Sequence, residues 1–395
     1  YTILKGKEYT ITALNFSSYG ASLVHLDEKG EVVLPLYNYT KPLDEKIITS
    51  FYKKYGPEMD FSIKTGSSNS GMLNTGMQLY WLKYSKPEKF NQIRYSLHLP
   101  QYLSYIFTGI PLSEYTSIGC HTALWDYGKK DYHDWVYKEH IHTILPPIVS
   151  ADTSSDIQYE GKKVKVGVGI HDSSAALLPY LRSEKKPFIL VSTGTWSVVL
   201  NPFTEGLLTE KEVKNEGINY MQIDGKPVKS SRIFLGNEHD LQVKILSDHF
   251  HVSPDYHKTV SFDFDLFRKI SGEFRQIFKW ISLPGEGGPG ETKLTHDTFD
   301  QAYHQLMIEL VMLLVKSIEV VKGSEAIDIL FVEGGFSDND VFLKLLSYYL
   351  SDMELRVTNS LSGPALGAAL LVSGTAVDNV FLKKHYGLQK LKPFS

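Results

Sequence analysis

Short apolar runs separated by polar turn residues open the chain. Residues 9–14, 21–26 and 31–36 each favour a β-strand, because apolar and β-branched side chains recur in them at short range. Small residues interrupt the first two runs at 17–20, and residues 27–30 (Asp-Glu-Lys-Gly) have the composition of a tight turn. The pattern therefore predicts an antiparallel meander at the start of the chain.

The next long segment, residues 74–108, changes to the helical period. Met77, Trp81 and Leu82 are spaced so that one face of a helix would be buried, and the segment ends at Thr108-Gly109. We predict helices over most of this segment.

Three further helices are predicted in the second half of the chain. The first covers residues 297–321, where these residues keep the helical period: Phe299, Ala302, Tyr303, Leu306, Leu310 and Leu313. The second covers 337–350, with Ser337 or Asp338 as its cap, and the third begins after Gly363-Pro364.

Two strand-to-helix transitions are also visible. A β-branched run at 164–170 ends at His171-Asp172, and residues 173–178 then open a helix. Residues 188–191 and 195–200 form a predicted hairpin, and a buried strand at 327–332 runs into Gly334-Gly335.

The order of meander, helices and strand-turn-helix thus occurs twice, which indicates two similar α/β lobes. We place an amino-terminal lobe at 1–182 and a carboxy-terminal lobe at 183–395, since charges and Pro187 interrupt the apolar pattern there.

Length and charge narrow the possible partners. At about 150 residues per domain, 395 residues with 42% apolar content suffice for two or three full-sized domains. The 41 basic and 45 acidic residues give a net charge of −4, which supplies no global positive field for nucleic acid or a membrane surface. The single cysteine, Cys120, excludes an intrachain disulfide framework and favours a cytoplasmic protein. The chain begins without methionine, so we expect it to be incomplete at its amino end.

Two familiar nucleotide signatures fail on inspection. Residues 285–292 have glycines at Walker A spacing, but Glu291 stands where a phosphate-binding lysine belongs. Residues 167–172 begin like a dinucleotide fingerprint, but Asp172 replaces its third glycine. Neither a P-loop nor a Rossmann site is indicated.

Two glycine-containing turns remain as candidate anion sites. The turn at 192–196 (Ser-Thr-Gly-Thr-Trp) offers hydroxyls and backbone N–H groups to phosphate oxygens, or it is an ordinary hairpin. The turn at 333–337 (Glu-Gly-Gly-Phe-Ser) would let a ligand lie against the backbone at a helix start, or it is simply a tight connection.

Asp172 is the best candidate for a general base. A carboxylate at the end of a buried strand can accept a hydroxyl proton while His171 positions the substrate, although an Asp N-cap has the same pattern. Residues 238–240 (Glu-His-Asp) could reach a sugar, but a surface loop is favoured. Five other histidines lack the spacing of a compact zinc motif and favour solvated helix faces: His133, His140, His142, His249 and His251.

Taken in order, five short motifs resemble those of the FGGY carbohydrate kinase family. They are 16–20 (Phe-Ser-Ser-Tyr-Gly), 169–172 (Gly-Ile-His-Asp), 192–196, 333–335 with Asn339, and 363–369 (Gly-Pro-Ala-Leu-Gly-Ala-Ala). The resemblance covers nearly the whole chain. Within the family, His171-Asp172 and Gly194-Thr195-Trp196 look most like the rhamnulokinase and L-fuculokinase branch, and Asn74-Thr75 and 114–116 point the same way.

This resemblance implies an α/β, two-lobed actin-like ATPase (ribonuclease H-like) fold with a nucleotide cleft between the lobes. It implies an ATP-dependent sugar kinase that uses Mg²⁺, with Asp172 as catalytic base. The implied substrate contacts are His171, Tyr19, Gly20 and Asn74; the implied ATP contacts are Gly194, Thr195, Gly334, Gly335 and Asn339. No residue is assigned to metal. The expected partner is a small-molecule sugar, with no nucleic acid or membrane, and the protein is expected to be a monomer or homodimer.

The chain departs from the family pattern at two places. The family's first phosphate loop, whose Asp helps to hold the metal, would precede Tyr1, so ATP-Mg binding by a chain without it is expected to be poor. The residues near Ser22 and at 37–40 differ from the usual sugar-loop pattern, which leaves the sugar open. A 6-deoxyketose of the L-rhamnulose or L-fuculose type is favoured. The alternatives are a kinase for another ketose or polyol (xylulose, ribulose or glycerol) and a non-catalytic sugar- or nucleotide-binding protein.

Overall fold

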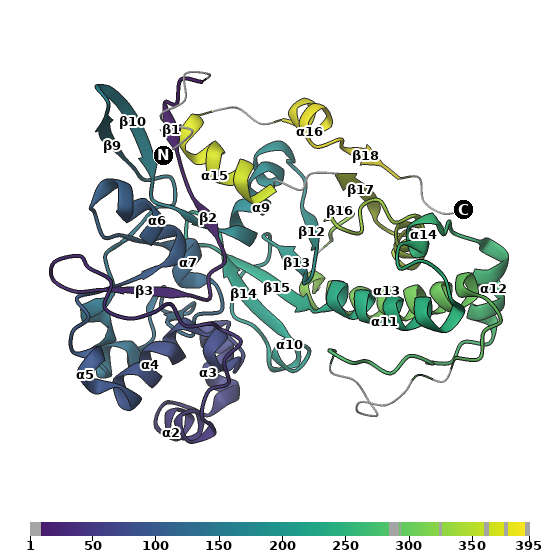
Figure 1. Ribbon diagram of the computed structural model, residues 1–395, viewed down its shortest axis with the longest axis horizontal. Helices are drawn as coiled ribbons and strands as arrows, with labels where there is room; N and C mark the ends of the chain where they lie inside the picture. Colours follow the sequence, from purple (N-terminus) through teal and green to yellow (C-terminus); the bar gives the residue numbers. More distant parts are fainter. Residues whose placement is uncertain are drawn as a thin grey trace. The chain divides into compact units, whose positions relative to one another are not determined.

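The computed structural model divides the chain into two compact units. It describes residues 9–283, 292, 294–323, 326–358, 363–374 and 378–391 (Figure 1). The first unit contains Tyr1–Ser183, Pro202–Ser230 and Ser362–Val377, and the second contains Glu184–Asn201, Ser231–Leu361 and Asp378–Ser395.

Short strands of the first unit pair over long sequence separations. The strand β1 (Ala13–Leu14) runs parallel to β10 (Lys162–Gly167), which is antiparallel to β9 (Ser154–Tyr159). Next in the chain, β2 (Ser17–Ser18) is parallel to β11 (Ile170–His171), with Ser18 opposite His171. Three other pairs complete the unit: β3 (Leu23–Leu26) with β4 (Tyr95–His98), β5 (Ser113–Glu114) with β8 (Ile148–Val149), and β6 (Trp125–Asp126) with β7 (Asp131–Tyr132).

The predicted amino-terminal meander is wrong. The second predicted strand, β3, pairs antiparallel with β4 about 70 residues later, and residues 31–36 contribute only an isolated bridge between Val32 and Leu26. The reason is burial: Val24, Leu26 and Leu97 form a small apolar cluster across β3 and β4, whereas Val32 and Leu36 remain about half exposed. A third strand at 31–36 would have buried little apolar surface.

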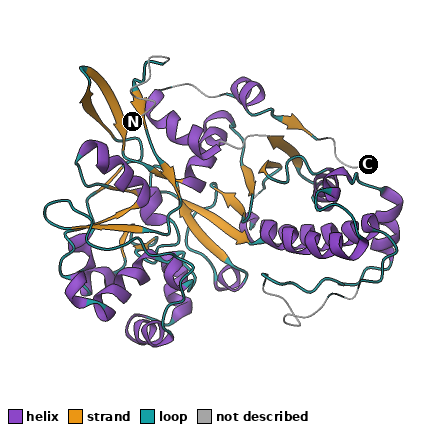
Figure 2. Ribbon diagram, in the orientation of Figure 1, coloured by secondary structure: helices purple, strands orange, loops and turns teal. Residues whose placement is uncertain are grey.

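Aromatic packing fills the core of the first unit. The ring of Phe51 makes edge-to-face contacts with Phe61, Tyr80 and Trp135 at centroid separations of 5.0–5.2 Å. Its helices, seen in Figure 2, are α2 (Glu45–Tyr55), α3 (Glu58–Thr65), α4 (Thr75–Ser85), α5 (Pro87–Phe90), α6 (Leu99–Thr108), α7 (Tyr115–Gly119), α8 (Asp134–Lys138), α9 (Asp172–Ser183), α10 (Glu210–Lys214) and α15 (Gly363–Ser373), with short 3₁₀ turns at Gly71–Leu73 and Ile141–Ile144. The predicted helical stretch 74–108 is thus present, with β4 inserted in it.

Two segments from the second half of the chain belong to the first unit. The predicted lobes, 1–182 and 183–395, were each continuous in sequence. The helix α15 packs on α9 so closely that a Cβ on Gly367 would lie 1.9 Å from the carbonyl oxygen of Ala175. The Asn15 amide donates to the carbonyl of Ala368 at 2.9 Å. In the other segment, which carries β14 (Gly217–Met221), the carbonyl of Met221 accepts from the Ser174 hydroxyl at 2.9 Å. Apolar burial and these bonds hold both segments to residues far earlier in the chain.

The second unit is built on a mixed sheet. The predicted hairpin is present as β12 (Phe188–Thr193) and β13 (Ser197–Asn201), and the sheet continues in the order β13-β12-β16-β17-β18. The strands β16 (Ile329–Gly334) and β17 (Glu354–Thr358) run parallel to β12, whereas β18 (Gln389–Lys390) is antiparallel to β17. Between the units in sequence lies β15 (Pro227–Ile233).

The predicted long helix is confirmed in the second unit. It is α13 (Phe299–Lys322), whose buried residues pack with those of β12 and β16 in one apolar core. The helix predicted at 337–350 is α14 (Asp340–Tyr349), but Asn339 caps it in place of Ser337 or Asp338. The other helices are α11 (Leu235–Phe250), α12 (Phe264–Gly272) and α16 (Asn379–His385), with a 3₁₀ turn at Tyr256–Thr259. In the described part of the chain, every helix is too short or too polar to cross a lipid bilayer.

The close approach of α15 to α9 predicts the effect of one methyl group. Gly367→Ala would place its Cβ against the Ala175 carbonyl, and overpacking of this kind costs about 1–3 kcal/mol. We expect the unfolding temperature of the first unit to fall by roughly 2–12 °C in a calorimetric scan. Gly272→Ala is the control, since a Cβ at that helical position meets nothing within 4 Å. Equal unfolding temperatures for the two variants would contradict the packing described here.

Candidate functional site

Asp172 and His171 lie at the junction of β11 and α9. Asp172 is the first residue of α9 and its side chain is 39% exposed, whereas His171 is buried. The Nε2 atom of His171 lies 3.2 Å from Oδ1 of Asp172, and the backbone N–H of Ser173 donates to the same oxygen at 2.6 Å. Among the described residues, none bonds to Oδ2. The carboxylate therefore has one oxygen held by the protein and one available to a ligand.

Strand pairing brings the predicted residues Tyr19 and Gly20 to the same place. Because β2 and β11 are in register at Ser18 and His171, the chain after β2 continues alongside the His171-Asp172 junction. A Cβ on Gly20 would lie 2.2 Å from Sγ of Cys120 and 2.9 Å from Cδ2 of His171, so only glycine fits here. The Tyr19 side chain is 41% exposed, with its ring 5.9 Å from that of Tyr39.

A buried carboxylate fixes the backbone of His171 through a hydroxyl group. The N–H of His171 donates to Oγ1 of Thr116 at 3.0 Å, and that hydroxyl donates to Glu114 at 2.8 Å. Glu114 also accepts from the backbone N–H groups of Thr116 and Ser117 at the start of α7. Burial raises the pKa of Glu114, and these hydrogen bonds oppose the shift. Sequence reasoning used residues 114–116 only as a family marker and missed this role.

His171 is neutral near pH 7. Burial lowers the pKa of His171, and the negative charge of Asp172 partly opposes the shift. With Nε2–H donating to Asp172, the lone pair of the neutral ring is on Nδ1, which is buried and has no hydrogen-bond partner among the described residues. The ring of Tyr220 packs beside it at a centroid separation of 5.2 Å.

Asn74, the fourth predicted substrate residue, is buried behind this junction. Its amide group donates to the carbonyl of His121 at 2.7 Å and accepts from the N–H of Ser70 at 2.8 Å. The structure therefore connects Asn74 to the site through the 120–121 turn.

In the second unit, three chain segments meet at glycines. The carbonyl of Thr193 accepts the N–H of Gly335 at 2.8 Å, and a Cβ on Gly334, whose φ is +90°, would lie 1.8 Å from that carbonyl oxygen. A Cβ on Gly236 would lie 1.9 Å from the carbonyl oxygen of Gly194. The β12–β13 turn, the β16–α14 turn and the start of α11 thus pack backbone against backbone. Gly236 was not among the predicted residues, because its role depends on a contact 42 positions away.

These segments line a cavity of about 560 Å³, which we call the glycine cavity. Four predicted residues line it: Gly194, Thr195, Gly335 and Asn339. The other lining residues are Gly236, His239, Asp240, His257, Lys258, Val260, Ser261, Phe336, Asp338 and Asp340. Gly334, the remaining predicted residue, is not among the lining residues and packs against the Thr193 backbone. A cavity of this size is in the range of small-ligand sites.

The two turns predicted to bind phosphate mainly allow backbone segments of the protein to approach one another. The backbone N–H groups of Gly194 and Gly335 are already hydrogen-bonded. The N–H of Gly194 donates to the carbonyl of Trp196 at 3.0 Å, and that of Gly335 is already used by Thr193. Asn339 accepts from the N–H of Phe342 at 2.9 Å and donates to the hydroxyl of Tyr303 at 2.8 Å. Burial raises the pKa of Tyr303 to about 12, so the hydroxyl stays protonated.

The favoured surface loop at 238–240 is wrong, since these residues lie in α11. Glu238 is buried and accepts from the N–H groups of Ile281 and Ser282, and His239 is buried with Nε2 3.2 Å from the Tyr303 hydroxyl. His239 also hydrogen-bonds to Asp240, which lowers the pKa of that carboxyl. Apolar residues at helical spacing, Leu235, Val243 and Leu246, were the signal that could have identified this helix.

The five other histidines lie in separate regions, except that the rings of His140 and His142 are 6.1 Å apart. His133 is buried, packs at 4.9 Å from the ring of Phe61 and accepts from the N–H of Trp135 at the start of α8, so the predicted solvated face is wrong for it. His249 and His251 are exposed at the end of α11. The predicted solvated helix face applies to His249, whereas His251 follows the helix as its cap.

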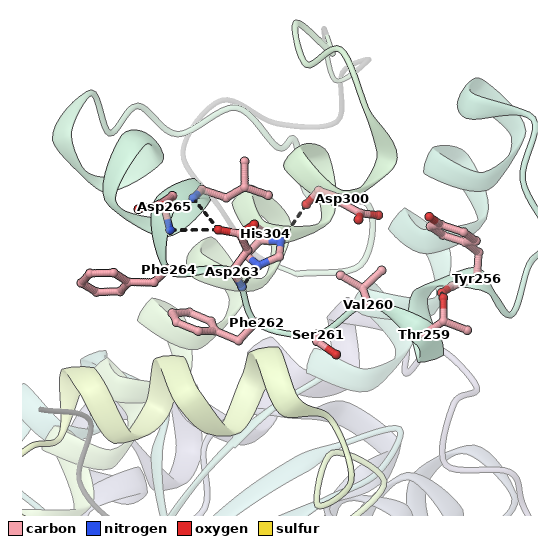
Figure 3. A pocket seen from close by; sticks show the side chains of 11 residues that line it. Tyr256, Thr259, Val260, Ser261, Phe262, Asp263, Phe264, Asp265, Asp300 and His304 are labelled. Atoms are coloured by element: carbon pink, nitrogen blue, oxygen red, sulfur yellow. Dashed lines mark hydrogen bonds between the residues drawn. The ribbon is translucent and has the colours of Figure 1, made fainter.

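A second cavity of the second unit, also about 560 Å³, contains none of the predicted residues. Figure 3 shows it lined by Tyr256, residues 259–266, Asp300 and His304; His304 Nδ1 donates to the Asp300 carbonyl and Nε2 accepts from the Asp263 N–H. It shares Val260 and Ser261 with the glycine cavity. The rejected Walker-like segment 285–292 lies outside the described residues except for Thr292.

Comparison with known proteins matches both halves of the chain to one family. Residues 3–177 match the N-terminal domain of the FGGY family of carbohydrate kinases, and residues 185–379 match the carbohydrate kinase FGGY C-terminal domain. A rhamnulokinase from Mannheimia succiniciproducens is 26% identical over 226 residues, which are 53% of this chain and 43% of that protein. The match thus spans less than half of the curated relative's length.

Solved structures share the fold. The chain is similar to a xylulose kinase from Rhodospirillum rubrum (TM-score 0.78, 14% identity, covering 100% of this chain and 82% of that one). It is also similar to a Plasmodium falciparum glycerol kinase with ADP (TM-score 0.71, 17% identity, covering 95% and 76%). The predicted α/β, two-lobed actin-like fold is therefore confirmed.

The hydroxyl of Thr116 gives a testable prediction about the His171 backbone. Thr116→Val keeps the side-chain shape but leaves the buried His171 N–H without its partner and removes one of the hydrogen bonds to Glu114, whose same oxygen keeps that of the Ser117 N–H. Each unsatisfied buried group costs roughly 1–3 kcal/mol. We expect a clear loss of stability in urea unfolding, and little loss in the Thr116→Ser control, which retains the hydroxyl. If Thr116→Val is as stable as Thr116→Ser, the Thr116 hydroxyl does not stabilise the backbone of His171.

Proposed function

Because the chain belongs to the FGGY family of carbohydrate kinases, we propose that it transfers the γ-phosphate of ATP to a hydroxyl group of a ketose. The observation that carries the proposal is the Asp172-His171 junction, where a half-exposed carboxylate is held through one oxygen beside a buried neutral imidazole. The substrate hydroxyl gives its proton to Asp172, its oxygen bonds to the γ-phosphorus, and ADP leaves.

Residues around the junction would orient the sugar. We propose that His171 contacts a sugar hydroxyl and that exposed Tyr19 lies against the ring, while Gly20 keeps the floor of the site free of a side chain. Asn74 would act by holding the backbone of His121. Positioning of this kind is the main contribution a protein makes to phosphoryl transfer.

The nucleotide is proposed to bind in the glycine cavity. Its volume suits a small ligand, and Gly194, Thr195 and Gly335 line it while Gly334 packs against the Thr193 carbonyl. We place Asn339 on the adenine side of this proposed site. Hydrogen bonds to the Tyr303 hydroxyl and to the backbone at the start of α14 fix its side chain. The ADP in the similar Plasmodium falciparum glycerol kinase structure supports a nucleotide as ligand of this fold.

Mg²⁺ fits the residues present. It prefers oxygen ligands; within the first unit the exposed carboxylate of Asp172 offers them, and within the second unit those of Asp240 and Asp338 at the glycine cavity do. When bound, the ion would neutralise charge on the phosphates during transfer.

A 6-deoxyketose such as L-rhamnulose or L-fuculose is the proposed substrate. The rhamnulokinase relative supports this choice. The single, unbridged cysteine supports a cytoplasmic location.

The proposal is tested by ATP-dependent ADP release with L-rhamnulose, L-fuculose, L-ribulose, D-xylulose and glycerol, together with calorimetric titration of each sugar. We expect turnover to be fastest with a 6-deoxyketose. Sugar binding without sugar-dependent ADP release would instead favour a non-catalytic binding protein, and preference for xylulose or glycerol would reassign the substrate.

Replacing the proposed base separates chemistry from binding. Asp172→Asn keeps the size of the side chain but cannot accept the hydroxyl proton. We expect kcat to fall by about two to four orders of magnitude, while the Kd for the sugar changes only a few fold. Retention of turnover by this variant would remove Asp172 from the role of base.

Gly335 tests the nucleotide placement without disturbing the fold. A Cβ there would have its nearest neighbour, the Thr193 carbonyl oxygen, 4.0 Å away, so a side chain can be added, and it would extend into the glycine cavity. We expect Gly335→Val to raise KM for ATP at least tenfold with the sugar KM within about twofold, and Gly335→Ala to have a smaller effect in the same direction. Equal weakening of both substrates in a variant with unchanged unfolding temperature would contradict the placement.

A further inference from the structure

Beside the junction, the first unit gathers three side chains with the chemistry of a transition-metal site. One donor atom each from Cys120, His121 and His171 lies within 4.8 Å of the others, and all three residues are buried. The candidate acidic ligands for Mg²⁺ are exposed carboxylates, so this cluster is chemically distinct from them.

The backbone of this cluster is shaped to make two adjacent side chains converge. In an extended chain, successive side chains point in opposite directions, so Cys120 and His121 would be separated. His121 instead has φ +36°, a left-handed conformation that is uncommon for a residue with a Cβ, and its carbonyl is held by the Asn74 amide. Strained backbone of this kind is concentrated at functional sites.

Gly20 makes room for the thiol beside the imidazole. A Cβ at that position would lie 2.2 Å from Sγ of Cys120 and 2.9 Å from Cδ2 of His171, so glycine is what leaves the thiol next to this ring. The Asp172 carboxylate bonds to the His171 ring, as outer-shell carboxylates do with metal-bound histidines. Asp172 is partly exposed, so a residue that is directly bonded to the cluster is in contact with solvent.

We propose that Cys120, His121 and His171 bind Zn²⁺, with water or another ligand in a fourth position. A thiolate and two imidazoles suit zinc and other borderline or soft metals, and not Mg²⁺. Bonds of about 2.0–2.3 Å place tetrahedral ligand atoms about 3.3–3.8 Å apart, so side-chain shifts of about 1 Å close the cluster around the ion. Binding releases the thiol proton to solvent as the sulfur–zinc bond forms, so affinity falls at lower pH.

Zinc binding does not depend on the proposed kinase activity. One consequence of it, competition between zinc and sugar, does rest on that proposed function. His171 is the proposed sugar contact beside the base, so zinc and sugar would compete for it. Zinc at a level that fills the site would then inhibit the kinase with a raised KM for sugar.

The single cysteine of the chain makes the test specific. Co²⁺ serves as the spectroscopic probe, because Cys120 is the single cysteine of these 395 residues and a thiolate-to-cobalt charge-transfer band from this chain would report on it. We expect this band with one equivalent of Co²⁺, its loss on addition of Zn²⁺, and its persistence in excess Mg²⁺. Calorimetry should give one Zn²⁺ per chain.

Two conservative variants and one control complete the experiment. Cys120→Ser and His121→Asn should each weaken Zn²⁺ binding at least tenfold; serine can still donate to the Ser117 carbonyl, and asparagine tolerates the left-handed backbone. The control is His249→Ala, which removes an exposed histidine outside the cluster. Cobalt binding without the charge-transfer band, or zinc affinity unchanged in Cys120→Ser, would overturn the proposal even if the protein is an active kinase. Zinc binding without competition from sugar would leave the metal site standing and count against His171 as a sugar contact.

Discussion

The candidate site of the first unit depends on how the last residue of β11 is held. The strand is only two residues long, yet His171 is in register with Ser18, its N–H is bonded to Thr116, and its ring is bonded to Asp172. Each of these partners comes from a different part of the chain. Because Thr116 is buried and bonded to Glu114, the backbone of His171 is held in place before any ligand binds, which reduces the ordering needed on binding.

The two sites use different means to receive their proposed ligands. In the first unit, the proposed site is built from polar side chains, the Asp172 carboxylate and the His171 ring, and Gly20 leaves room beside that ring. In the second unit, the glycine-rich turns mainly allow backbones to approach one another, and the N–H groups of Gly194 and Gly335 are already bonded within the protein. Recognition there falls more to the shape of the cavity and to side chains such as Asn339 than to a nest of free amides.

Local patterns were predicted well and distant contacts were not. The β12–β13 hairpin and α13 follow from spacing within one segment, and the order of short motifs predicted the fold. The pairing of β3 with β4 and the burial of His133 depend on partners far away in the sequence. The left-handed turn at His121 carries no local signal such as glycine or asparagine, so the convergence of Cys120 with two histidines appears only in three dimensions.

The discontinuous make-up of the first unit has a consequence for synthesis on the ribosome. Its segments are separated by residues 184–201 and 231–361 of the second unit, and α15 lies in its last segment. The nascent first unit must therefore expose the face of α9 that α15 later covers until residues near 373 have left the exit tunnel. At about 5–20 residues per second, that interval lasts roughly 10–40 s after α9 is made. During this time the apolar face of α9 is a natural target for chaperones.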